Sequence, residues 1–162
     1  MRLLKHGLLS ILILFILLTA IGSLFPSDII VSRAVNISAN KDSVETFISN
    51  YNKWNLWMEG AKQSEFKVVA QDSTKAFFGT TTIQLQSVIN NIWKHEWKGR
   101  NTIQYSTIQL IQKNNITIVQ WQFEQHVKWY FWQKFGTMLN DKILGTTMEQ
   151  SLDNLKKLVE TK

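Results

Sequence analysis

IQYSTIQLIQKNNITIVQWQFEQHV, residues 103–127, carries the clearest structural signal of the chain. Apolar and polar residues alternate on both sides of residues 113–115, which is the pattern of two half-buried strands joined by a tight turn. Asparagine suits such a turn because it tolerates positive φ. The segment therefore predicts an antiparallel hairpin with strands over 103–111 and 116–127. The alternation turns Val119, Trp121 and Phe123 toward one face.

The same pattern extends toward the N-terminus. Further strands are predicted over 66–70, 75–78, 80–89 and 92–97, and short turn sequences rich in Asn, Asp, Ser and Gly separate them. Hairpin after hairpin predicts an antiparallel meander. Ahead of it, residues 29–37 predict one more strand. Two short helices should follow, the first with Val44, Phe47, Ile48 and Tyr51 on its apolar face and the second with Trp54 and Trp57.

Toward the C-terminus, residues 131–160 predict one long helix. Its apolar face is formed by residues spaced 4, 4, 3 and 4 apart, namely Leu144, Met148, Leu152, Leu155 and Val159. Gly136 and Gly145 are weak points of this helix, at which a kink is possible. A sheet needs its apolar face covered, and this helix is the only long element available for that purpose. The expected fold is α+β, with a curved antiparallel sheet around the C-terminal helix and a cavity between them.

The N-terminal segment differs from the rest of the chain. Residues 7–25 carry no charge, and a helix of this length can cross the hydrocarbon core of a bilayer. Arg2 and Lys5 precede the run, so we expect residues 1–25 to be a membrane anchor with residues 26–162 on the outer side of the cytoplasmic membrane. A cleaved signal peptide is an alternative, because small residues lie near Ile21, but the apolar run is longer than usual for one. A buried core helix is the third possibility.

Composition narrows the function classes. The chain has 162 residues, one proline, no cysteine, and 18 basic against 12 acidic side chains. A disulfide framework, a cysteine nucleophile and a cysteine-ligated metal are therefore excluded. The basic residues are spread along the chain rather than gathered in a stripe, so no nucleic-acid partner is expected. Residues 26–162 contain no linker or repeat and should form one domain.

Four segments together resemble a known family. They are VSRAVNIS (31–38), KDSVETFISNYNKWNLW (41–57), TIVQWQFEQ (117–125) and GTTMEQSLDNLKKLVE (145–160). They look like the polyketide cyclase/dehydrase and lipid-transport family of the START/Bet v 1-like (SRPBCC) superfamily, in the membrane-anchored bacterial type. The resemblance implies a helix-grip fold and a cavity for a hydrophobic ligand. It implies no single reaction, because fold does not fix function.

Aromatic residues are the main candidates for such a cavity, because aromatic-lined cavities bind apolar ligands. The same side chains could equally fill a solid core. Trp54 and Trp57 are expected to be structural wedges beneath the first helices. The candidate ligand-binding residues are Trp93, Trp97, Tyr105, Trp121, Phe123, Phe135 and Met138.

Catalytic signals are weak. His95 would point the same way as Trp93 and Trp97 if the three share a face, but an ordinary histidine at the surface of the sheet is the favoured interpretation. Glu124 and His126 share a strand face, yet the inward alternation of their neighbours would turn them outward, so no metal site is expected. The sequence lacks the common nucleophile, phosphate-loop and zinc motifs. We expect no catalytic residue and no cofactor.

Residues 128–132, KWYFW, form the most unusual local segment. Trp129, Tyr130 and Trp132 favour contact with the membrane interface, whereas a buried start of the last helix is the alternative. The sequence as a whole predicts a membrane-tethered domain that binds a hydrophobic or lipid-like small molecule. Binding without catalysis is the favoured interpretation. A cyclase- or hydratase-type enzyme using the same cavity, and a ligand-free interaction module, remain alternatives.

Overall fold

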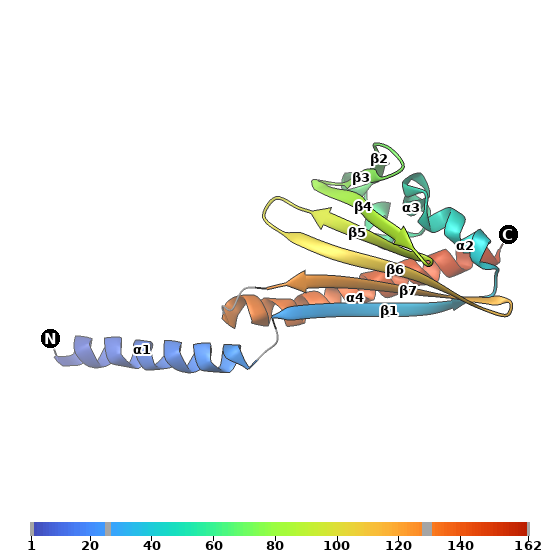
Figure 1. Ribbon diagram of the computed structural model, residues 1–162. Helices are drawn as coiled ribbons and strands as arrows, with labels where there is room; N and C mark the ends of the chain where they lie inside the picture. Colours follow the sequence, from blue (N-terminus) through green and yellow to red (C-terminus); the bar gives the residue numbers. More distant parts are fainter. Residues whose placement is uncertain (1, 25–26, 128–130, 162) are drawn as a thin grey trace.

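The computed structural model describes the backbone of residues 2–24, 27–127 and 131–161, and their side chains except at residues 2–4, 64 and 131–141 (Figure 1). The strands are β1 (Asp28–Ile37), β2 (Val68–Ala70), β3 (Lys75–Phe78), β4 (Thr81–Ile89), β5 (Ile92–Lys98), β6 (Ile103–Lys113) and β7 (Ile116–His126). The helices are α1 (Arg2–Ser23), α2 (Lys41–Ile48), α3 (Tyr51–Trp57) and α4 (Phe131–Glu160), with 3-10 turns η1 (Glu59–Lys62) and η2 (Ser64–Phe66).

All strands in the described part belong to one antiparallel sheet, in the order β1-β7-β6-β5-β4-β3-β2. The first strand pairs with the last, so that Val31 lies opposite Phe123 and Arg33 opposite Trp121. A bulge in β4 between Leu85 and Ser87 interrupts the register with β5. Such bulges bend a strand, which helps the sheet to curve. The antiparallel meander predicted from the sequence is confirmed.

The tight turns also follow the sequence. Asn90, Asn91 and Asn114 have positive φ values of 52°, 61° and 55°, a conformation that asparagine tolerates better than most residues. One predicted strand is shorter than expected: residues 64–66 form η2, and β2 begins only at Val68. Phe66 there packs its ring against that of Phe78, with centroids 5.7 Å apart, instead of extending the ladder.

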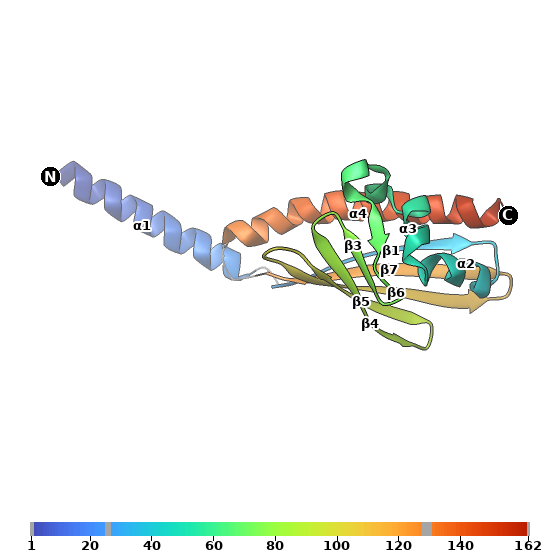
Figure 2. The same ribbon diagram turned by 90° about the horizontal axis from the view of Figure 1, so that it is seen from above.

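The long C-terminal helix α4 covers one face of the sheet, as Figure 2 shows from above. Met148, Leu152, Leu155 and Val159 are buried on it, which confirms the predicted apolar face. Polar contacts fix α4 to the turn after α3. The backbone N–H of Glu59 donates to Ser151 Oγ over 2.9 Å, and Asn154 Nδ2 donates to Glu59 Oε2 over 2.7 Å. We call the sheet face that α4 covers the inner face.

Helix α1 extends away from the domain (Figures 1 and 2). Residues Lys5–Ser23 are long and apolar enough to cross a membrane, and the apolar side chains between Leu8 and Leu17 are exposed. The end of α1 contacts α4 near the start of that helix (Figure 1). The buried hydrophobic side chains of the described part all belong to residues 31–159, so α1 supplies none of the core.

Candidate ligand-binding site

The inner face of the sheet carries four of the predicted ligand-binding residues. Trp93, Trp97, Trp121 and Phe123 are buried there. Tyr105 does not join them: its side chain is 50% exposed, because in β6 the inward positions are those of Ser106, Ile108 and Leu110. The expectation that Tyr105 lines the cavity is therefore wrong. Phe135 and Met138 lie in the part of α4 whose side chains are outside the described residues.

The inner-face aromatics contact one another and the two tryptophans of α3. The ring centroids of Trp97 and Phe123 are 5.2 Å apart, and those of Trp121 and Phe123 are 5.4 Å apart. Trp57 meets Trp121 edge-on at 5.6 Å. Trp54 and Trp57 are almost fully buried and donate their indole N–H groups to the carbonyls of Ile48 and Phe47. Both side chains therefore wedge the short helices onto the sheet.

His95 lies on the inner face with Trp93 and Trp97, and only 2% of its side chain is exposed. The sequence favoured a histidine at the sheet surface, and that interpretation is wrong. The ring meets Tyr51 and Trp54 edge-on, with centroids 5.9 and 5.3 Å away. Burial lowers the pKa of His95 to about 4, so the imidazole is neutral at pH 7. Its Nδ1 is buried and has no hydrogen-bond partner among the described residues.

A second buried polar atom on the inner face is also unpaired. Trp121 Nε1 has no acceptor among the described residues, although Trp97 Nε1 donates to Ser106 Oγ over 2.8 Å. A buried donor without a partner costs about 1–3 kcal/mol, and such groups are rare in folded proteins. Nδ1 of His95 and Nε1 of Trp121 are thus two buried polar atoms without partners among the described residues, in a layer that is mostly aromatic.

Arg33 is a charged side chain on the inner face. It occupies the same phase of β1 as Val31, Val35 and Ile37 and is half-buried. Its Nη1 donates to the carbonyl of Ser32 over 2.8 Å. The guanidinium lies against Gly145 of α4, where an added Cβ would stand only 2.7 Å from Cζ. Gly145 therefore leaves the room that this side chain occupies.

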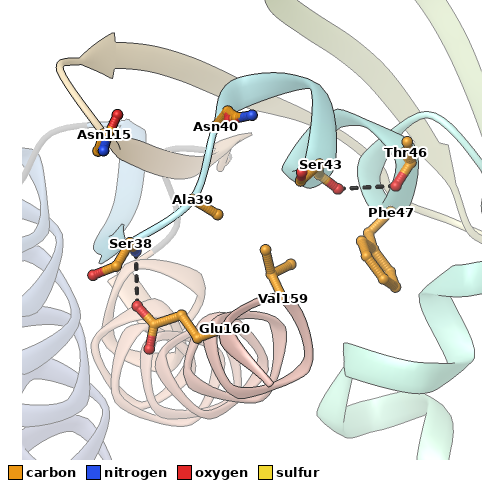
Figure 3. Close-up of a pocket in the computed structure, with 9 residues that line it drawn as sticks. All are labelled: Ser38, Ala39, Asn40, Ser43, Thr46, Phe47, Asn115, Val159 and Glu160. Carbon is orange, nitrogen blue, oxygen red and sulfur yellow. Dashed lines mark hydrogen bonds between the residues drawn. The ribbon is translucent and has the colours of Figure 1, made fainter. Parts of the chain in front are cut away.

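An open groove lies between the β1–α2 connection and the end of α4 (Figure 3). This end of α4 is at the opposite end of the domain from α1 (Figure 1). Its volume is about 660 Å³. The backbone N–H of Ser38 donates to Glu160 Oε1 across it over 2.7 Å. Its lining residues are Ser38, Ala39, Asn40, Ser43, Thr46, Phe47, Asn115, Val159 and Glu160. Most of this lining is polar, and none of the predicted ligand-binding residues takes part in it.

The remaining sequence expectations concern Glu124, His126 and residues 128–132. Val119, Trp121 and Phe123 point inward, which turns Glu124 and His126 to the exposed face as predicted. His126 Nδ1 lies 2.6 Å from Asp28 Oδ1. Within the described residues, no three His, Asp or Glu side chains gather as a metal site would require. Trp129 and Tyr130 lie outside the described residues, as does the side chain of Trp132.

Sequence reasoning missed Arg33 and Gly145 as parts of the inner face. One signal was present, because Arg33 stands in phase with the apolar residues of VSRAVNI rather than with its polar ones. Gly145 has no comparable signal, because a glycine within a helix pattern indicates a weak point more readily than a contact.

Comparison with known proteins defines the fold. No protein-family model and no curated protein matches the sequence. Solved structures do match. A START superfamily protein from Mycobacterium smegmatis has 15% identity and a TM-score of 0.58 over 82% of this chain and 97% of its own. CalU16 from Micromonospora echinospora has 14% identity and a TM-score of 0.57 over 82% and 73%. A conserved protein from Geobacillus kaustophilus has 10% identity and a TM-score of 0.60 over 82% and 96%. The chain therefore has the START/Bet v 1-like helix-grip fold.

Proposed function

We propose that this protein binds an apolar, lipid-like small molecule between the inner face of the sheet and α4, without catalysis, while α1 tethers the domain to a membrane. The observation that carries the proposal is the pair of unmet polar atoms in the aromatic layer, His95 Nδ1 and Trp121 Nε1. A ligand with a polar group would satisfy them, while its apolar part would contact the surrounding rings.

Binding is favoured over chemistry because the interior offers a poor acid–base group. A general base works best when its pKa is near the working pH. The pKa of His95 is about 4, so the neutral ring is a weak base and accepts a proton poorly at pH 7. The burial of His95 is the observation that supports a cyclase- or hydratase-type enzyme. A side chain with this low pKa suits a hydrogen-bonding role better than proton transfer.

The membrane tether is the second part of the proposal. Residues 1–25 form the anchor and residues 26–162 the binding domain. Lys5 precedes the apolar span, which favours the cytoplasmic side for the N-terminus and the outer side for the domain. This is the arrangement expected of a membrane-anchored bacterial member of the superfamily.

The short connection between α1 and β1 supports a position close to the bilayer. Ser23 ends α1 and Asp28 begins β1. The intervening residues 24–27 extend over at most about 14 Å. The start of α4 lies near the end of α1 (Figure 1). This arrangement supports the proposal that the aromatic segment 128–132 meets the headgroup layer. A lipid-like ligand could then exchange directly with the membrane.

The test uses the full chain in phosphatidylcholine nanodiscs and the neutral dye N-phenyl-1-naphthylamine, with empty nanodiscs as the reference. We expect saturable one-to-one binding above that reference. Trp121→Ala should weaken it by about tenfold, because the ring contributes apolar contact. Tyr105→Ala is the matched control, since it removes an aromatic ring from the exposed face of the same sheet.

Two results would contradict the proposal. Absence of saturable binding would favour a filled core and hence an interaction module without a ligand. Equal loss of affinity in Trp121→Ala and Tyr105→Ala would show that the dye binds elsewhere. Both results are distinguishable from misfolding, because circular dichroism reports the fold of each variant.

A further inference from the structure

The strand β1 contributes a positively charged side chain, Arg33, to an interior that is mostly aromatic and aliphatic. Arg33 faces α4, and its guanidinium rests against Gly145. The described residues contain two ion pairs, Lys62 with Glu59 and His126 with Asp28, and neither involves Arg33. The only hydrogen bond of its guanidinium to a described residue goes to the carbonyl of Ser32. A guanidinium has five N–H donors, so the described residues leave most of this donor capacity unused.

A second donor lies directly across the strand pair. Arg33 of β1 is the register partner of Trp121 in β7. Side chains of such partners lie on the same face, with Cβ atoms about 4.5–5.5 Å apart. The indole N–H of Trp121 is buried and has no acceptor among the described residues. A cation and a neutral N–H donor are therefore neighbours on the inner face. Among the described residues, the indole N–H has no acceptor and the guanidinium has only the carbonyl of Ser32.

The guanidinium and the indole N–H indicate which chemical groups a ligand would need in order to pair with them. A partly buried cation is costly without a counter-charge, and guanidinium groups pair best with planar oxyanions through two parallel hydrogen bonds. The rings of Trp57 and Phe123 pack against the ring of Trp121 and offer apolar contact nearby. The complementary molecule therefore has an oxyanion at one end and an apolar body.

We infer that Arg33 and Trp121 form the head-group subsite of the proposed binding site and that the ligand is an anionic amphiphile with a carboxylate or similar oxyanion. The inference rests on the proposed function, because it names the ligand class of the same site. Arg33 holds the oxyanion, Trp121 donates to it, and Gly145 leaves room for the guanidinium beneath α4.

Two dyes of the same ring system test the subsite. The neutral probe is N-phenyl-1-naphthylamine and the anionic probe is 8-anilinonaphthalene-1-sulfonate, both titrated into the full chain in phosphatidylcholine nanodiscs. Arg33→Gln should lower the affinity for the sulfonate by at least about tenfold, the loss expected of a charge-assisted pair, and leave the neutral dye within about twofold. Arg33→Lys should restore part of the loss, because it keeps the charge but not the paired geometry.

Three further variants test the subsite more sharply. Arg100→Gln is the matched control, because it removes the same side chain from an exposed turn and should change neither affinity. Gly145→Ala should weaken sulfonate binding selectively, because the added methyl group would collide with the guanidinium. Trp121→Phe keeps a ring and removes the indole N–H, so it should also act mainly on the sulfonate.

The possible outcomes separate the inference from the proposed function. Binding of the neutral dye with equal sulfonate affinity in the wild type and Arg33→Gln would overturn the subsite and leave the cavity intact. Failure of both dyes to bind would overturn both the inference and the proposed function.

Asp141 precedes Gly145 by four residues in α4. If Arg33→Gln and Asp141→Asn each lower the melting temperature and the double variant lowers it no further, Arg33 belongs to an internal ion pair and the inference is wrong.

Discussion

The indole ring of Trp54 in α3 stacks on the indole ring of Trp97 in β5, with ring centroids 6.1 Å apart and planes 29° from parallel. Trp54 is fully buried, and its N–H donates to the carbonyl of Ile48 at the end of α2. One side chain thus joins both short helices to the centre of the sheet.

Removal of this side chain should destabilise the domain strongly. Trp54→Ala deletes a buried ring and leaves a cavity, which typically costs about 3–5 kcal/mol. Urea denaturation followed by circular dichroism measures the change in the free energy of unfolding. Tyr105→Ala, on the exposed face, should change it by less than about 1 kcal/mol. A cost for Trp54→Ala no larger than that of the control would contradict the described packing.

The packing of α4 on the sheet makes a second prediction. Leu155 is fully buried in this interface, so Leu155→Asp would bury a carboxylate that lacks a partner. We expect a loss of several kcal/mol, about 3 or more, or failure to fold. Lys157→Asp adds the same carboxylate on the exposed side of the helix and serves as the control. Equal melting temperatures for the two variants would refute the buried position of Leu155.

The buried histidine makes stability depend on pH. The pKa of His95 falls from 6.5 in the unfolded chain to about 4 in the fold, so below pH 6.5 the unfolded state binds more protons. The contribution of His95 to the free energy of unfolding is therefore fully present above pH 6.5 and is lost as the pH falls toward 4. The loss from this group amounts to about 3 kcal/mol. Denaturation curves at a series of pH values should show it in the wild type and in His126→Gln, but not in His95→Phe. A pH-dependent loss of the same size in His95→Phe would assign it to other groups.

Topology is tested with fusions at the C-terminus. A reporter that works only outside the cytoplasm, such as alkaline phosphatase, should be active when it is joined after Lys162. A reporter that folds only in the cytoplasm should be inactive at the same position. The reverse pattern would contradict the proposed orientation of α1. Immunoblots of the membrane fraction show in the same cells whether the N-terminal segment has been removed.

Membrane contact by residues 128–132 is tested without α1, which supplies none of the described core. Residues 26–162 should sediment with anionic vesicles at low salt, because Lys128 and Lys134 contribute up to about 1 kcal/mol each. Replacement of Trp129 and Trp132 by Ser should weaken sedimentation, and Trp93→Phe, inside the core, should leave it unchanged. Wild-type protein that stays in the supernatant would favour a buried start of α4.

The sequence predicted most of the fold because its signals are local. Alternation, asparagine turns and the spacing of Met148, Leu152 and Leu155 each report on a few neighbouring residues. The length of β2 was misjudged because Phe66 packs on Phe78, a contact between separate segments.

The candidate site was less predictable for the same physical reason. Which face a strand residue occupies depends on register, and a single phase error moves a side chain to the other side. Tyr105 was assigned inward and lies outward, and His95 was favoured at the surface and lies inside. Arg33 meets Gly145 only because β1 lies beneath α4, and no pattern within either segment encodes that meeting.

The length of α4 gives the protein two ends with different surroundings. Thirty residues of helix rise about 45 Å, from the neighbourhood of α1 to the groove beside Glu160. With α1 in a bilayer, the helix acts as a spacer that sets the height of that groove above the lipid. With this arrangement, a molecule from the aqueous phase would reach the groove end of α4, and a hydrophobic molecule from the bilayer would reach the end near α1.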